Sequence, residues 1–400
     1  MKINQLRDAL NGTLSTVGIL DQVTGEAAVA NEDLSNIVDI GKSVLNYTGT
    51  SNENFDSFVR SLIDHVGKIM FVDRKYASQA PNILMDAWEY GSVLEKVRVE
   101  APEVAENATW DLFNYPKTGG PAYPDPFALA PPTVQAKFYN SKNTYEIPIT
   151  ITSVQLKEAF QSASQLSSFV SAIENRIQMK MTLSNDALIM ATICNLIGQK
   201  FAAGAEVNLL SLYNGASGTL TAAEALTDKD FLRFASKTIA QYKKYLAAAS
   251  ALYNDGSYIT FTPEDKLKFI TNTEFAKSLS AYLYSDTYHD EFVKLAGYDE
   301  VAFWQGTGTA GGDRLKIDVT VDVNGTPKEV SNSYVLAVMF DRDAAAVCNQ
   351  NYRITSIYNP RGEYTNYFYK YDAMFMNDVV ENCVVFTLAD STVSDVEDGE

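Results

Sequence analysis

Residues that commonly carry chemistry are scarce in this chain of 400 residues. Only two histidines occur, His65 and His289, so a catalytic triad or a histidine-rich metal site would have to use these two. The three cysteines, Cys194, Cys348 and Cys383, lie far apart in apolar surroundings, and no C-x-x-C is present. This pattern indicates buried thiols in place of disulfides or metal ligands, and we expect no metal and no cofactor.

Basic residues are also few. The chain has 32 Lys and Arg against 50 Asp and Glu, which gives a net charge of −18. Broad binding to DNA or to an anionic membrane is excluded, because phosphate binding needs clustered Lys and Arg. The N-terminus lacks the apolar core of a signal peptide, and no apolar run of about 18 residues occurs. We therefore expect synthesis in the cytoplasm and no membrane association.

Two short motifs have both a chemical and a structural interpretation. The stretch GTGTAG, Gly306–Gly311, matches the dinucleotide-binding pattern, which requires a helix directly behind it. Residues Arg314–Val323 alternate like a strand instead, so a loop between strands is favoured, and a nucleotide-binding enzyme using residues 306–312 stays as a less favoured alternative. His289 lies among acidic residues without metal-ligand spacing, which favours a surface polar cluster.

Aromatic residues are plentiful, with 23 Tyr and 20 Phe. The stretch Tyr364–Tyr371 could stack nucleic-acid bases, but few basic residues lie near it. Its aromatic positions alternate like a strand, so packing in a core or a subunit interface is favoured.

The longest regular pattern covers residues 167–203. Phe169, Ile173, Ile177 and Met181 follow each other at i+4, and proline is absent. This spacing predicts a long amphipathic helix of about 55 Å. Short polar residues at Thr182–Asp186 leave open a bend or two helices end to end.

A proline-rich segment lies between two predicted strands. The strands are residues 93–99 and the stretch VQAKFYN from Val134, and a third begins at Tyr145. Residues 116–132 hold six of the 12 prolines, which excludes a regular element there. The pattern predicts an extended, exposed flap.

Other patterns predict a mixed α+β chain. Helices are expected at 54–66, from a cap at Thr227 with Asp230 to about 246, and at 274–284 with Thr273 as N-cap. Strands are expected at 267–271, 301–304, 314–323, 333–340 and 353–358. The last residues, 389–400, are acidic and lack apolar periodicity, which predicts disorder.

One C-terminal stretch resembles a known family. Residues Asn359–Tyr371, NPRGEYTNYFYKY, running on to Val384–Phe386, resemble the major capsid proteins of phi-twenty-nine-like podophages. Three further stretches are similar in the same order, namely Phe58–Phe71, Phe138–Phe160 and Ser168–Ile177.

The resemblance implies an α+β Hong Kong ninety-seven-type capsid fold. In that fold a spine helix crosses a P domain, an E loop reaches over a neighbouring subunit, and an A domain lies at the capsomer centre. The expected division is an N-terminal arm at 1–50, P domain at 51–75, E loop at 76–150, P domain at 151–226 with the spine helix at 167–203, A domain at 227–350, P domain at 351–388 and an acidic disordered tail at 389–400.

The function implied is structural, not enzymatic. We expect a major capsid protein that self-assembles into hexamers and pentamers of an icosahedral or prolate phage head around double-stranded DNA, with portal and scaffolding proteins as partners. The alternative within the same fold is a cellular nanocompartment shell. The expected assembly contacts are Pro116, Pro121, Pro124, Pro126, Asn359, Arg361, Tyr364 and Tyr367.

Overall fold

A computed structural model describes most of the chain. It covers residues 3–17, 27–31, 35–45, 80–84, 94–99, 134–140, 142–153, 155, 163–216, 218–256, 258–283, 297–305, 314–323 and 325–395. The helix expected at 54–66, the four proline contacts and the glycine-rich stretch 306–312 lie outside these residues.

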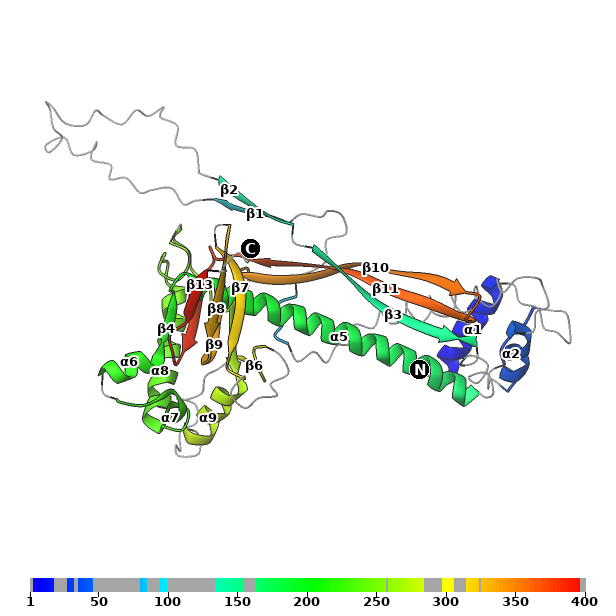
Figure 1. Ribbon diagram of the computed structural model, residues 1–400, viewed down its shortest axis with the longest axis horizontal. Coiled ribbons are helices and arrows are strands. Elements are labelled where there is room, and N and C mark those ends of the chain that lie inside the picture. The colour runs from blue at the N-terminus through cyan, green and yellow to red at the C-terminus, as the bar shows by residue number, and fades with distance from the viewer. Residues whose placement is uncertain are drawn as a thin grey trace, which may run out of the picture.

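A single helix, α5 (Ala163–Ala202), runs along the long axis of the molecule (Figure 1). It has 40 residues, so the predicted long helix is confirmed and continues without a break through Thr182–Asp186. The hydroxyl of Thr182 donates to the Gln178 carbonyl at 2.8 Å, one turn back. The Thr182 hydroxyl is therefore satisfied by a carbonyl of its own helix, and neither a helix end nor a break lies in this stretch.

A three-stranded antiparallel sheet lies along α5, in the order β10 (Ala345–Asn359), β11 (Tyr364–Asn377), β3 (Lys142–Thr152) (Figure 1). Alternate residues of β11 face the helix, and Tyr367, Tyr369 and Tyr371 are at most 2% exposed. They belong to the same hydrophobic core as Ile177 and Ile193 of α5. The aromatic stretch therefore packs in a core, as its alternation predicts.

Strand β3 lies within the segment expected as E loop, 76–150, and pairs with β11 from Lys142 to Thr152. Tyr145, Ile147 and Ile149 alternate along it and pack on the core around α5. The boundary of the E loop itself stays a prediction.

A second sheet crosses one end of α5. Its five strands are ordered β4 (Glu206–Asn208), β12 (Cys383–Thr387), β9 (Val335–Asp341), β5 (Leu267–Asn272), β6 (Asp299–Val301). All residues of β9 are buried because both faces are covered. Val338 and Phe340 face the core around α5, whereas Leu336 and Met339 face the core around α8 (Lys229–Ala247). Helices α6 (Leu209–Ala216), α7 (Ala222–Ala225) and α9 (Thr273–Leu283) complete this end.

A third sheet contains the acidic end of the chain. Its order is β13 (Thr392–Asp395), β8 (Thr326–Asn332), β7 (Ile317–Val323). The prediction of disorder from residue 389 is wrong for 392–395, because Thr392 and Val393 favour extended backbone and pair with β8. Strand β7 packs closely on α5 at Gly198, where a Cβ atom would lie 2.5 Å from Val319 Cγ2.

Two predicted helix caps are displaced by one residue. Helix α8 is capped by Asp228, whose carboxylate accepts from the Phe231 N–H at 2.7 Å, and not by Thr227. Before α9, the Asn272 side chain accepts from the Glu274 N–H at 2.9 Å, so Thr273 is not the cap. Asp and Asn are stronger N-cap residues than Thr, which explains both shifts.

The N-terminal helices pack on the main core. They are α1 (Ile3–Val17) and α2 (Ile37–Leu45), both within the expected arm. Leu10, Leu14, Ile37 and Ile40 are at most 2% exposed and share a core with Ile177.

Part of α5, Asn175–Ala202, is long and apolar enough to cross a membrane by length and composition alone. Half of its most apolar window is buried inside the subunit, as in the core helix of a globular protein.

Candidate assembly surfaces

A two-stranded ribbon projects from the subunit beside the β10–β11 sheet (Figure 1). It consists of β1 (Leu94–Val99) and β2 (Val134–Tyr139), two strands that the sequence predicts and that pair antiparallel. Residues directly opposite each other lie on the same face of such a pair. The register therefore separates Lys96, Lys137 and Arg98 on one face from Val97, Val99, Val134, Ala136 and Phe138 on the other.

The inward face of the ribbon is held by ion pairs. Lys96 Nζ lies 2.7 Å from Asp378 Oδ2 and 2.7 Å from Glu381 Oε1. Arg98 also pairs with Glu381, and Lys137 Nζ lies 3.1 Å from Asp378 Oδ1. We call these five residues the ribbon clamp. The side chains of Asp378 and Glu381 are only 3% and 13% exposed, so these are partly buried ion pairs. Removal of one partner from such a pair leaves a buried charge without compensation.

The environment of the clamp shifts the pKa values of Asp378 and of the neighbouring Tyr139. Burial would raise the pKa of Asp378, but the hydrogen bond and charge of Lys96 and the charge of Lys137 hold it below its ordinary value. The pKa of Tyr139 is raised, first by burial and then by the charge of Asp378. Asp378 therefore stays ionised in the folded subunit, and its negative charge compensates the positive charges of Lys96 and Lys137.

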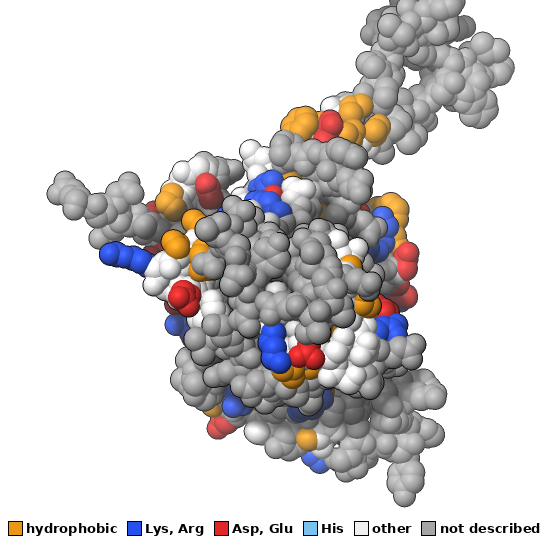
Figure 2. All heavy atoms as spheres, turned by 90° about the vertical axis from the view of Figure 1, so that its right-hand side faces the viewer, with side chains coloured by type: hydrophobic (Ala, Val, Ile, Leu, Met, Phe, Trp, Pro, Cys, Tyr) orange, Lys and Arg blue, Asp and Glu red, His pale blue; other side chains and the backbone are white. Residues whose placement is uncertain are grey.

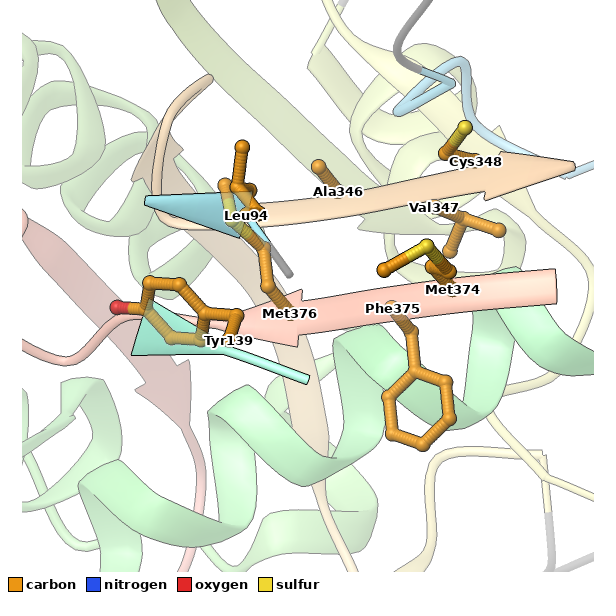
Figure 3. A pocket seen from close by; sticks show the side chains of 8 residues that line it. All are labelled: Leu94, Tyr139, Ala346, Val347, Cys348, Met374, Phe375 and Met376. Atoms are coloured by element: carbon orange, nitrogen blue, oxygen red, sulfur yellow. The ribbon is translucent and has the colours of Figure 1, made fainter. Parts of the chain in front are cut away.

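A small apolar pocket lies under the base of the ribbon (Figure 3). Leu94 and Tyr139 of the ribbon form one side of it. Strands β10 and β11 form the other side with Ala346, Val347, Cys348, Met374, Phe375 and Met376. Leu94 and Tyr139 are opposite each other in the register, so one end of the inward face is apolar and the rest is charged.

The outward face of the ribbon is apolar and uncovered. Val97, Val99, Val134 and Phe138 are each at least 55% exposed. Figure 2 shows hydrophobic side chains, with an acidic one among them, at the top of the molecule at the height of the ribbon. In most sheets the apolar side chains are buried and the charged ones face solvent. In the ribbon the cationic side chains face the subunit and the valines face solvent. An exposed apolar face of this kind marks an interaction site.

The NPRG motif forms the turn between β10 and β11. The Asn359 side chain accepts from the backbone N–H groups of Arg361 and Gly362 at 3.0 and 3.2 Å, and its amide donates to the Tyr364 hydroxyl at 2.9 Å. A Cβ atom on Gly362 would lie 2.4 Å from the Tyr364 ring. The Glu363 carbonyl accepts from the Ser153 N–H at 3.0 Å, which ties the turn to the end of β3. The motif therefore has a local role in closing the hairpin.

The expected contact residues occupy different environments. Arg361 is exposed at the tip of this turn, and Asn359 and Tyr364 are half-buried beside it. Tyr367 is 1% exposed and packs in the core of its own subunit, where its ring is not on the surface. Contact of Asn359, Arg361 and Tyr364 with other subunits stays a prediction.

The sequence reasoning missed the ribbon clamp. A signal was available, because the stretch from Leu94 to Val99 alternates glutamate, valine and valine with leucine, lysine and arginine. The alternation predicted a strand, but it did not show which face would be covered. The partners, Asp378 and Glu381, follow β11 in a turn almost 300 residues away, and no local pattern connects them to the ribbon.

The part of the chain that the structure describes resumes at Arg314 after the Gly-rich stretch, and its first regular element there is strand β7, from Ile317 to Val323. The described residues also contain no group of three or more His, Cys, Asp and Glu placed to hold a metal ion.

Comparison with known proteins identifies one matching family. A sequence model described as Phi29-like phage major capsid protein matches residues 18–387. No curated protein matches the chain. The match covers most of the chain, including the ribbon, α5 and the NPRG turn.

Solved phage capsids are similar over most of the chain at low identity. The capsid of Staphylococcus phage Andhra is 12% identical, with 77% of this chain and 83% of that chain covered and a TM-score of 0.49. The capsid of cyanophage P-SCSP1u is 11% identical, with 77% and 87% covered and a TM-score of 0.39. The mature capsid of bacteriophage PhiM1 is 7% identical, with 76% and 84% covered and a TM-score of 0.39.

Proposed function

Because this chain belongs to the family of Phi29-like phage major capsid proteins, we propose that it forms hexamers and pentamers that close into an icosahedral or prolate head around double-stranded DNA. Its role is structural, in the capsid of the virion. The family match over residues 18–387 carries this conclusion. The expected α+β class is what the described residues show, with one long helix beside an antiparallel sheet.

The expected division into arm, P domain, E loop and A domain is part of this proposal. In it α5 is the spine helix, the ribbon is part of the E loop, α6 and α7 belong to the P domain, and α8 and α9 with β5 to β9 form most of the A domain. Strand β12, from the segment expected as P domain, pairs with β9 and β4. The A and P domains would therefore share one sheet.

We propose that the shell encloses DNA without binding it strongly. The net charge of −18 suits a shell whose inner wall does not hold DNA by phosphate contacts. A portal protein and a scaffolding protein are proposed as further partners, with assembly in the host cytoplasm. A nanocompartment shell and a nucleotide-binding enzyme are not favoured by the family match.

Expression of the full chain tests the proposal. Negative-stain electron microscopy should show shells or ring-shaped capsomers, alone or with a co-expressed scaffolding protein from the same genome. A folded protein that stays monomeric in both conditions would contradict it. Deletion of residues 116–132 should leave a folded subunit that does not form stable shells, and normal shells from this deletion would remove the role given to the flap.

A further inference from the structure

Three buried sulfur-bearing side chains lie outside both hydrophobic cores. Cys348 on β10 and Met374 and Met376 on β11 are 3%, 3% and 6% exposed. Neither the core around α5 nor the core around α8 contains them. They line the apolar pocket under the base of the ribbon instead (Figure 3). These side chains therefore form a buried layer of their own, where the β10–β11 sheet meets the ribbon.

The strand register brings the three side chains to one side of the sheet. Cys348 is directly opposite Met374, and residues directly opposite each other share a face. Met376 lies two positions further along β11, so it points the same way. In Figure 3, Met374 and Met376 project to one side of β11 and Phe375 to the other. The Met-x-Met spacing therefore places two thioethers next to one thiol.

A small residue facing a large one leaves space beside these sulfur atoms. Ala346 is directly opposite Met376, and Leu94 and Tyr139 line the same pocket from the ribbon. The space has room for a single water-sized sphere. Water needs several polar partners to stay in such a cavity, and the lining is almost entirely apolar. The space therefore suits an occupant that sulfur atoms bind directly.

The donor atoms determine which ions this pocket can bind. Thiolate and thioether sulfur are soft ligands that select Cu(I), whereas Mg²⁺ and Ca²⁺ require oxygen. The lining residues include no carboxylate and no imidazole. A monovalent ion also suits the charge, because Cys348 releases its proton to solvent on binding and a thiolate with Cu(I) is neutral. A neutral pair costs far less to bury than an uncompensated charge.

A neighbouring amide orients one of the thioethers. The side-chain N–H of Gln350 donates to Met374 Sδ at 3.1 Å, and Gln350 is 6% exposed. A thioether sulfur has two lone pairs, so one stays available to a metal ion. Hydrogen bonds to ligand side chains fix their direction and raise metal affinity. Met374 is therefore held in place, while the unbranched side chain of Met376 can adjust to an ion.

We propose that Cys348, Met374 and Met376 bind one soft monovalent metal ion, with Cu(I) as the ion of this class. The inference goes beyond the proposed function and does not depend on it, because all three ligands belong to one subunit. The set differs from the His, Cys, Asp and Glu clusters sought above, since two of its ligands are methionines. The ion ties β10 to β11 under the ribbon, at the pocket that Leu94 and Tyr139 line.

Competition with a Cu(I) chelator tests the site on the full chain. The reduced protein is titrated without oxygen into the coloured complex of Cu(I) with bicinchoninate, and the loss of colour measures the copper transferred. We expect one ion to bind per chain. Cys348→Ser should lower the affinity at least about tenfold, and so should the double variant Met374→Leu with Met376→Leu. Leucine nearly conserves the volume of methionine, so the double variant keeps the packing of the pocket.

The matched controls are Met339→Leu and Cys194→Ala, which change a buried methionine and a buried cysteine outside the pocket. Both should bind copper as the unmodified chain does, and X-ray absorption of the loaded chain should show only sulfur ligands. A chain that takes no copper from the chelator overturns the inference. Equal affinity in the pocket variants, or coordination by nitrogen or oxygen, also overturns it. None of these results requires shells, so the capsid role is tested separately.

Discussion

The β10–β11 hairpin and the β1–β2 ribbon are both pairs of antiparallel strands, yet they attach to the subunit in opposite ways. The hairpin buries a row of tyrosines against α5 and keeps its turn in water. The ribbon turns three cations toward the subunit and leaves its valines uncovered. Apolar burial depends little on pH or salt, whereas ion pairs depend on both. The hairpin is therefore a permanent part of the subunit, and the ribbon is attached conditionally.

Removal of a buried ring from the hairpin should have the largest effect. Tyr369→Ala deletes a side chain that is 2% exposed in the main core. The free energy of unfolding should fall by about 3–5 kcal/mol, measured by urea denaturation. Tyr369→Phe keeps the ring and is the matched control, with an expected change of no more than about 1 kcal/mol. Equal losses in the two variants would show that the ring is not what attaches the hairpin.

Neutralisation of the clamp should loosen the ribbon without unfolding the subunit. In Asp378→Asn the charges of Lys96 and Lys137 lose their shared partner. Cys348 reports the result, because it lies in the pocket that Leu94 and Tyr139 cover. Its reaction with a thiol reagent should become about tenfold faster by local opening.

Two controls accompany this measurement. Cys194 and Cys383 are buried elsewhere in the cores and should react at unchanged rates. Glu300→Gln removes an ion pair with Lys277 whose side chains are 31% and 64% exposed, and it should have no effect on Cys348. An unchanged rate for Cys348 in Asp378→Asn would show that the clamp does not hold the ribbon.

The same attachment should depend on pH. The pKa of Asp378 is lowered in the folded subunit, so its contribution is complete above the unfolded value of about 3.9 and is lost as the pH falls through the lower folded value. Cys348 should therefore react faster in acid, measured with a dipyridyl disulfide, which reacts with thiols at low pH. Asp378→Asn should react fast throughout, and a parallel rise in both proteins would exclude Asp378 as the cause.

Substitutions on the outward face should have the smallest effect on the subunit. Phe138 is 62% exposed, and Phe138→Ser should change the free energy of unfolding by no more than about 0.5 kcal/mol. The yield of shells in electron micrographs should nevertheless fall. Val393→Thr, at a site 41% exposed on β13, is the control that should leave both quantities unchanged. Full shell yield from Phe138→Ser would remove the outward face from the assembly contacts.

Much of the fold could be predicted because its signals are local. The i+4 spacing from Phe169 to Met181 predicted α5, and the alternation in Tyr364–Tyr371 predicted a buried strand. The caps were wrong by one residue, because neighbouring side chains compete for the same backbone groups. Strand β8 was missed, since Pro327 and its polar neighbours resemble a loop until β7 and β13 pair with them.

The candidate surfaces could be predicted only in part. The two strands of the ribbon were expected from their alternation, whereas the flap at 116–132 lies outside the described residues and stays a prediction. The clamp joins Lys96 to Asp378 across 282 positions of sequence. Which face of a ribbon is covered depends on what lies beneath it, and that is a property of the whole fold.

The unbroken course of α5 has a consequence for closed surfaces. A polyhedron built from identical copies needs some angle that adjusts between fivefold and sixfold positions. Helix α5 is continuous through Thr182–Asp186 and packs on the main core, so the structure offers no hinge where its sequence is most polar. The ribbon is attached differently, by ion pairs between three cations and two carboxylates, which makes it the element to compare between fivefold and sixfold positions.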